Sequence, residues 1–310
     1  DAASAMTASR FGRSLSDFIF GPPRDSDAAT DFALRQVATH VGACFLYEAA
    51  RNDGVAPSVV VGCGAGEIAA LVAAGVFTFE AGLDIVCLRA AAIMARARPG
   101  AMLGMEVSAD RLHHLLRFLY RRHLQIAGVN SDRHCQLSGP PEDIAALEAV
   151  ALALGLTTRR SPSPHPLHSP AMSGAVAPFL DSISHLSPGA PTLPVWSASL
   201  GRAYTARDDI LACLAYQLVE PIDIVAAVRD LSGHGFVDCG SQGELAAWLN
   251  ATARAGSVFS LDGGDGSIKG HIAAIRDTLA GRPSPQAIAQ PTPPPAAPPR
   301  AADIAARIIA

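Results

Sequence analysis

The chain has 310 residues, of which 49% are hydrophobic and 17% charged, so it can bury a sizeable core as one large domain or two smaller ones. A formal net charge of -4, with no basic block beyond residues 121–123, argues against a nucleic-acid partner. No apolar run is long enough to span a bilayer, and six cysteines without a Cys-x-x-Cys pair favour reduced thiols in a cytoplasmic protein.

The first hundred residues predict an α/β unit built around one buried strand. Helices are expected over 15–20, ended by a Gly-Pro-Pro turn, and over 28–50, where large apolar residues recur at helical spacing. Residues 58–70 follow as a β-branched strand, a turn of small residues and an alanine-rich helix. A long helix over 79–97 carries Arg89, the only charge between positions 85 and 94.

The strand, turn and helix over 58–70 have the outline of a nucleophile elbow. An elbow needs small residues on both sides of its apex because the two backbones approach closely, and it holds the apex in a strained conformation. The apex here is Gly64, which has no side chain to react. The sequence therefore predicts the backbone of a catalytic site without the expected nucleophile.

Residues 101–160 follow a different pattern. Strands are expected over 101–107, 124–130, 134–138 and 157–160, with helices over 109–120 and 142–156. The order β-α-β-β-α-β is that of a ferredoxin-like unit. Because it interrupts an α/β pattern that resumes afterwards, we interpret it as an inserted small subdomain.

The larger unit resumes with a proline-rich loop over 161–170 and a helix over 171–183. Short strands are expected over 195–199, 236–239 and 257–261, with helices between them, one over 222–231. We therefore expect a large α/β subdomain of residues 1–100 plus 161–285 and a small one of 101–160.

Both ends of the chain suggest that it is a piece of a longer protein. The first residues show neither an initiator Met nor a signal-peptide pattern. Residues 286–301 are proline-rich and predict a semi-extended linker. Residues 302–310 are amphipathic, and we expect them to begin a following domain, for which a carrier protein is one candidate.

Several segments between about residues 15 and 282 together resemble the acyltransferase domains of modular polyketide synthases and the malonyl-CoA:acyl-carrier-protein transacylases. The family's Gly-His-Ser-x-Gly-Glu elbow is matched by Gly62-Cys63-Gly64-Ala65-Gly66-Glu67, and its helix arginine by Arg89, at 89 − 64 = 25 positions after the apex. Further matches are Pro99-Gly100-Ala101-Met102, Ala127-Gly128-Val129-Asn130, Leu137-Ser138-Gly139, His168-Ser169-Pro170-Ala171-Met172, Gln217-Leu218-Val219-Glu220-Pro221 and Phe236-Val237-Asp238-Cys239-Gly240.

This resemblance implies an α/β-hydrolase-like large subdomain with an inserted ferredoxin-like small subdomain and a catalytic cleft between them. It also implies ping-pong acyl transfer, in which an elbow serine takes an acyl group from acyl-CoA. The serine passes the group to the phosphopantetheine thiol of an acyl carrier protein, among neighbouring synthase domains. No permanently bound cofactor is implied.

The resemblance also assigns roles to residues of this chain. His168 would be the general base and acid, and the backbone N–H of Ala65 would donate half of an oxyanion hole. Arg89 would bind the free carboxylate of a malonyl-type substrate. Asn130, His165 and Leu167 would line the substrate site.

The chain departs from the family at several places. Gly64 replaces the serine and Cys63 the histidine before it, and the family's N-terminal Gly-Gln-Gly-Ser-Gln segment, which supplies a core strand and the second oxyanion donor, is not found upstream. The segment from His165 to His168 matches neither the usual malonyl nor the usual methylmalonyl signature. The sequence therefore does not indicate which acyl group the domain would recognise.

Several alternatives stay open. Cys63 is either a substitute nucleophile or a buried wall residue, and we favour the wall because relatives that use cysteine place it at the apex. Arg89 either binds a carboxylate or forms an ion pair with Glu67 or Asp84. The glycines around the apex lack phosphate-loop spacing, and the histidines lack metal-ligand spacing, so we expect no metal site. The domain is either an acyltransferase or an inactive module that docks or binds a carrier protein.

Overall fold

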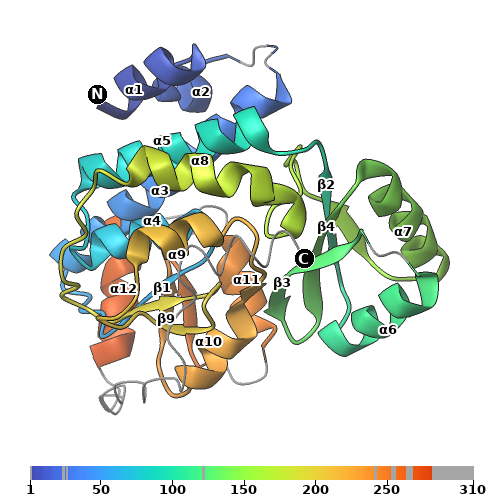
Figure 1. Cartoon of the computed structure of the whole chain (residues 1–310). Helices are drawn as coiled ribbons and strands as arrows, with labels where there is room; N and C mark the ends of the chain where they lie inside the picture. The colour runs from blue at the N-terminus through green and yellow to red at the C-terminus, as the bar shows by residue number, and fades with distance from the viewer. Residues whose placement is uncertain are drawn as a thin grey trace.

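The computed structural model describes residues 2–22, 25, 27–120, 123–240, 243–252, 256–262 and 268–280. The expected linker over 286–301 and the expected start of a domain over 302–310 lie outside these residues. Within them the chain forms an α/β-hydrolase-like large subdomain, with the ferredoxin-like small subdomain to one side (Figure 1).

The N-terminal part of the large subdomain is mostly helical. Its elements are α1 (Ala2–Phe11), α2 (Leu15–Phe20), α3 (Ala28–Asn52), β1 (Val60–Gly62), α4 (Gly66–Ala73) and α5 (Phe79–Arg96). The Asp27 side chain accepts hydrogen bonds from the N–H groups of Ala29 and Thr30, which defines where α3 begins. In the same way the Thr78 side chain caps α5.

The small subdomain consists of β2 (Ala101–Met105), α6 (Ala109–Leu119), β3 (Gln125–Ser131), β4 (His134–Gly139), α7 (Pro141–Ala153) and β5 (Thr158–Arg160). Four of its strands lie in the order β5-β2-β4-β3, all antiparallel. Helices α6 and α7 cover the side of this sheet that faces away from the large subdomain (Figure 1). Between sheet and helices lies a separate apolar core that includes Leu103, Leu112, Leu137 and Ile144.

The chain then returns to the large subdomain. Its remaining elements are a 3₁₀ turn (Pro170–Met172), α8 (Ser173–Ile183), β6 (Val195–Ser197), β7 (Arg202–Ala203), α9 (Ile210–Tyr216), β8 (Ile222–Asp223), α10 (Ile224–Asp230), β9 (Phe236–Asp238), α11 (Glu244–Asn250), β10 (Val258–Ser260) and α12 (Ile268–Ala280). Strand β1 pairs in parallel with β6, and β9 pairs in parallel with β10. Among the described residues no strand pairs with the second edge of β1.

The sequence-based assignment of a helix over 222–231 is wrong at its start. Ile222 and Asp223 form β8, which pairs in parallel with β3 and adds a fifth strand to the sheet of the small subdomain. The helix begins only at Ile224, because the Asp223 side chain accepts a hydrogen bond from the N–H of Ala226 and caps it. A segment that follows α9 of the large subdomain thus pairs with the sheet of the small subdomain and connects the two.

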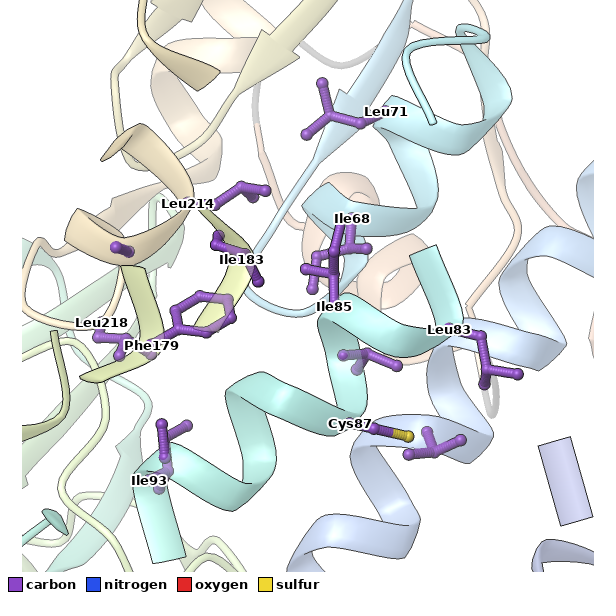
Figure 2. Packing of buried hydrophobic residues seen from close by; sticks show 14 of the residues in the cluster. Ile68, Leu71, Leu83, Ile85, Cys87, Ile93, Phe179, Ile183, Leu214 and Leu218 are labelled. Carbon is purple, nitrogen blue, oxygen red and sulfur yellow. The ribbon is translucent and has the colours of Figure 1, made fainter. Parts of the chain in front are cut away.

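The main core lies between α4, α5, α8 and α9 (Figure 2). Figure 2 shows Ile68 and Leu71 of α4 and Ile85 of α5 pointing into the same interior as Phe179 and Ile183. Each fully buried side chain of this kind contributes roughly 1.5–3 kcal/mol to folding. This packing holds α4 and α5, the helices that carry Glu67 and Arg89, rigidly side by side. No described helix combines the length and apolarity needed to cross a membrane.

Candidate active site

The elbow between β1 and α4 has the tight backbone predicted from the sequence. Gly64 at its apex has φ +55°, in the left-handed region that side chains rarely adopt. A Cβ on Gly62 would lie 2.5 Å from the Cα of Glu67, so only glycine fits there. The N–H of Glu67 donates to the Gly64 carbonyl, and the N–H of Ala65 lies at the N-terminus of α4, where helix N–H groups lack intrahelical partners.

His168 lies in the proline-rich loop and is held by the backbone of residues 217–220. Its N–H donates to the carbonyl of Leu218 at 3.0 Å, and its Nδ1 lies 2.9 Å from the carbonyl oxygen of Gln217 and 3.1 Å from that of Glu220. Carbonyl oxygens only accept hydrogen bonds, so Nδ1 carries the proton and Nε2 keeps a free lone pair. Burial, reinforced by the charge of Arg89, lowers the pKa of His168 to about 4, which keeps the ring neutral near pH 7.

The free nitrogen of His168 faces the apex of the elbow. A Cβ built on Gly64 would lie 3.5 Å from His168 Nε2, which is the nearest atom to it. A serine hydroxyl extends one bond further than Cβ and would reach hydrogen-bond distance of Nε2. His168 Nε2 therefore faces the apex of the predicted nucleophile elbow, at a residue without a side chain.

Arg89 on α5 is buried, with 1% of its surface exposed, and its partners are neutral amides. Its Nη1 donates to Gln36 Oε1 at 2.5 Å and its Nη2 to Gln217 Oε1 at 3.5 Å, while Nε has no partner among the described residues. Burial lowers the pKa of Arg89 to about 10, so the guanidinium still carries its charge at neutral pH.

The two carboxylates considered as ion-pair partners of Arg89 have other contacts. Asp84 pairs with Arg10. Glu67 is fully buried and accepts hydrogen bonds from the Tyr204 hydroxyl at 2.5 Å and from Gln217 Nε2 at 2.6 Å. No ion pair found among the described residues includes Arg89. In the described part of the chain the guanidinium thus contacts no carboxylate directly, although the nearby charge of Glu67 opposes the effect of burial on its pKa.

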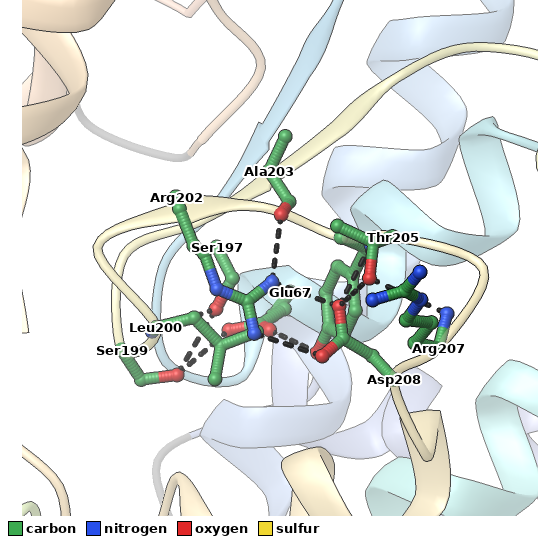
Figure 3. A network of polar contacts seen from close by, with 10 residues as sticks. Glu67, Ser197, Ser199, Leu200, Arg202, Ala203, Thr205, Arg207 and Asp208 are labelled. Carbon is green, nitrogen blue, oxygen red and sulfur yellow. Dashed lines mark hydrogen bonds and ion pairs between the residues drawn. The ribbon is translucent and has the colours of Figure 1, made fainter. Parts of the chain in front are cut away.

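A polar network behind the elbow positions the partners of Glu67 (Figure 3). Arg202 forms a two-bond ion pair with Asp208 at 2.8 Å, and Asp208 also accepts from the N–H and hydroxyl of Thr205. These contacts hold the segment between β7 and α9, from which Tyr204 reaches Glu67. Burial raises the pKa of Glu67, opposed by the hydrogen bonds that it accepts.

Cys63 points to a different part of the molecule. Its side chain packs with those of Val59 and Val61 against the apolar cluster around α10 and β9. Burial, together with the nearby charge of Glu67, raises the pKa of the Cys63 thiol to about 12. At neutral pH the residue is therefore an apolar thiol and not a thiolate.

Two other candidate residues, His165 and Leu167, lie in the same loop as His168. His165 has 7% of its surface exposed, packs edge-on against Phe32 with ring centroids 5.0 Å apart, and has no partner for either ring nitrogen in the described part of the chain. Burial lowers its pKa. Leu167 is buried, and its carbonyl accepts from the Ser138 hydroxyl of β4.

Asn130 lies at the junction of the two subdomains. Its Nδ2 is 3.2 Å from His134 Nδ1, and the His134 ring stacks on Trp248 of α11. None of the hydrogen bonds found among the described residues joins Asn130 to Arg89 or His168. Its predicted role in substrate binding stays a prediction.

Sequence reasoning did not identify two residues that connect the site. Gln217 joins three parts of it, since its carbonyl accepts from His168 and its side chain contacts both Glu67 and Arg89. Gln36 is the second amide beside Arg89. The sequence held a signal for each of them. Gln36 is an amide one helical turn after Phe32, and Gln217 begins the Gln-Leu-x-x-Pro match. In the part of the chain that is described, no group of three or more His, Cys, Asp or Glu residues is placed to hold a metal ion.

Comparison with known proteins identifies the family. The family model of the acyl transferase domain matches residues 1–254, and the chain belongs to this family. The chain is 31% identical over 201 residues to the polyketide synthase GfsB of Streptomyces halstedii, which covers 63% of this chain and 4% of that protein. It is 32% identical over 205 residues to the polyketide biosynthesis protein ThaF of Burkholderia thailandensis, covering 64% of this chain and 17% of that protein. The chain thus spans only a small part of these relatives.

Solved structures show the same fold. A loading acyltransferase from the avermectin modular polyketide synthase superposes with a TM-score of 0.80 at 22% identity, covering 90% of each chain. The malonyl CoA-acyl carrier protein transacylase of Coxiella burnetii superposes with a TM-score of 0.77 at 22% identity, covering 89% of this chain and 88% of that one.

Proposed function

We propose that this domain binds a malonyl-type acyl thioester, as acyl-CoA or on the phosphopantetheine of an acyl carrier protein, without forming an acyl-enzyme. One observation carries the proposal: Nε2 of His168 faces a Cβ position at Gly64 that has no side chain. His168 Nε2 and the backbone of the elbow are arranged as for acyl transfer, but the atom that would be acylated is missing at residue 64. The domain then acts as a binding module of a polyketide synthase-type assembly in the cytoplasm, with neighbouring synthase domains as partners and no permanently bound cofactor.

The environment of Arg89 supports a substrate with a free carboxylate. A buried guanidinium with an unpartnered Nε and two neutral amide neighbours offers donors in the planar arrangement that a carboxylate accepts. The nearby charge of Glu67 offsets only part of the cost of burying this guanidinium, and a directly bound anionic ligand would offset more of it. An acyl group without a carboxylate would leave this charge unpaired.

An active transferase that uses Cys63 is the alternative. It requires a thiolate directed at the substrate, whereas the Cys63 side chain packs beside α10 and its pKa is raised to about 12. The contacts of Cys63 therefore support a wall residue.

Intact-protein mass spectrometry after incubation with malonyl-CoA and acetyl-CoA tests the proposal. We expect no covalent adduct on the wild-type chain or on Cys63→Ala, and an acyl adduct on Gly64→Ser, because the new hydroxyl lies beside His168. A wild-type adduct that disappears in Cys63→Ala would show that the domain is an acyltransferase with a thiol nucleophile.

Calorimetric titration with thioether analogues of malonyl-CoA and acetyl-CoA, in which a CH₂ group precludes cleavage, tests the pocket. We expect the malonyl analogue to bind more tightly, and Arg89→Met to remove the difference. Equal binding of the two analogues to the wild type would exclude the carboxylate site.

A further inference from the structure

We propose that the domain hydrolyses the bound acyl thioester directly, with a solvent water taking the place of the serine hydroxyl. The inference rests on the proposed binding function and adds an activity to it. Three features of the described residues carry it: the space in front of His168 Nε2, the position of the proton on that ring, and the N–H of Ala65 at the N-terminus of α4.

The space in front of His168 Nε2 exists because the residue at the apex of the elbow is a glycine. Gly64 has no side chain, and the nearest atom to its Cβ position is His168 Nε2 at 3.5 Å. A Cβ on the neighbouring Gly66 would meet no atom within 4 Å, so the first turn of α4 is open there as well. A water molecule that donates to Nε2 then lies close to where a serine Oγ would be, on the line of attack at the substrate carbonyl.

The ring of His168 presents an unprotonated nitrogen, Nε2, toward this space. Its Nδ1–H is directed to the carbonyl oxygens of Gln217 and Glu220, so the lone pair is on Nε2. The same two carbonyls stabilise the imidazolium that forms when Nε2 takes a proton, as an orienting acceptor does in other histidine-based sites. None of these contacts involves residue 64, so loss of the serine leaves the base in place.

The reaction balances without any co-reactant other than water. As water oxygen bonds to the thioester carbon, Nε2 accepts one of its protons and the carbonyl oxygen becomes an oxyanion near the N–H of Ala65. Collapse of this intermediate breaks the C–S bond, and the imidazolium returns the proton to the departing thiolate. The products are the free acid and the free thiol of coenzyme A or of phosphopantetheine. Arg89 would hold the distal carboxylate, which fixes the thioester relative to the water.

The expected rate is that of a site that keeps its binding and base but lacks a covalent nucleophile. Serine proteases that have lost a member of their triad retain roughly a 10³–10⁴-fold acceleration over solvent through substrate binding and the oxyanion hole. The domain would therefore be a slow hydrolase that removes acyl groups from thioesters, and not a transferase.

The test follows malonate and coenzyme A by liquid chromatography after incubation of the wild-type chain with malonyl-CoA. We expect both products in equal amounts and no covalent adduct by mass spectrometry. His168→Ala should lower the rate by about 10²-fold or more, because it removes the general base. His113→Ala, an exposed histidine on α6 far along the chain, is the matched control and should leave the rate unchanged.

Gly64→Ala tests the space itself. Its methyl group would occupy the position 3.5 Å from Nε2 and exclude the water, so hydrolysis should fall to the level of His168→Ala. Binding of the malonyl thioether analogue should be retained within about threefold, which would also show that the variant is folded.

The possible outcomes separate this inference from the proposed function. Analogue binding by the wild type without malonate release above the His168→Ala level overturns the hydrolysis and leaves the binding function intact. Release with a covalent intermediate, or conversion to acetyl-CoA by loss of the carboxylate, overturns the direct water route. Absence of analogue binding overturns both.

Discussion

The two sides of the site differ. On one side, His168 contacts three backbone carbonyls and Arg89 donates to two side-chain amides, so both side chains have defined orientations. On the elbow side, Gly64 retains the left-handed backbone of an apex residue but presents no reactive atom. The contacts that orient His168 and Arg89 come from residues 36 and 217–220, and none comes from residue 64. Residue 64 therefore takes no part in the contacts that orient His168 and Arg89, whereas Gln217 connects both of them to Glu67 on the helix that follows the elbow.

Gln217 gives the largest expected effect, because its side chain contacts both Glu67 and Arg89. Gln217→Leu removes the donor to Glu67 and an acceptor from Arg89, and leaves both buried groups with fewer partners. We expect a loss of about 3 kcal/mol in the free energy of unfolding, measured by urea denaturation. The His168 contact is to the Gln217 backbone and should survive, so malonyl-analogue binding should weaken more than acetyl-analogue binding. Equal weakening of the two would contradict a link between Gln217 and Arg89.

The buried histidines make the free energy of unfolding depend on pH. Burial lowers the pKa of His168 and of His40 to about 4, against about 6.5 for unfolded histidine. Between these values the unfolded state binds more protons, so the stability from each group is complete above about pH 6.5 and is lost as the pH falls toward 4. Each histidine should contribute about 2–3 kcal/mol of this change, on the order of 1.4 kcal/mol per pKa unit.

Urea midpoints of the wild type and of His168→Gln at pH 7.5 and 5.0 measure this contribution. The variant should lose less stability than the wild type on acidification. Glu67 has a raised pKa and acts in the opposite direction, but it is common to both proteins and cancels in the difference. An identical loss in both would mean that His168 titrates normally.

Two glycine substitutions test how closely the backbones of β1 and α4 approach each other at the elbow. Gly62→Ala would place its Cβ 2.5 Å from the Glu67 Cα, and it should destabilise the fold by about 1–3 kcal/mol through overpacking. Gly66→Ala meets no atom within 4 Å and should stabilise α4 by about 0.5–1 kcal/mol. Thermal unfolding compares the two, and a similar loss for both would show that the strand and helix backbones are less close than described.

Changes at Cys63 should have the smallest effect on stability and activity. With a thiol pKa near 12, it should react with iodoacetamide at pH 8 far more slowly than an exposed cysteine of ordinary pKa, as followed by peptide mass spectrometry. Cys63→Ala removes one buried sulfur atom and should cost about 1 kcal/mol, with no effect on thioester hydrolysis. Rapid alkylation at neutral pH would revive the thiol-nucleophile hypothesis.

Local patterns predicted much of the fold. The elbow was recognisable because a β-branched strand, small turn residues and an alanine-rich helix have a distinctive order. The β-α-β-β-α-β order of residues 101–160 likewise indicated the ferredoxin-like fold. The strand β8 was not predicted, because two residues that pair with β3 and are followed at once by a helix carry no periodicity of their own.

The sequence by itself determined the family resemblance, the glycine at the apex and the residue types that surround it, since these depend on order and spacing along the chain. Only the tertiary structure decided that His168 Nε2 faces Gly64, that Cys63 packs against the apolar cluster around α10, and that Arg89 donates to two amides and forms no ion pair with Glu67 or Asp84. Gln36, Arg89 and Gln217 are separated by dozens of residues and meet only when α3, α5 and the segment after α9 pack together. Such contacts follow from the packing of whole helices, which no local pattern specifies.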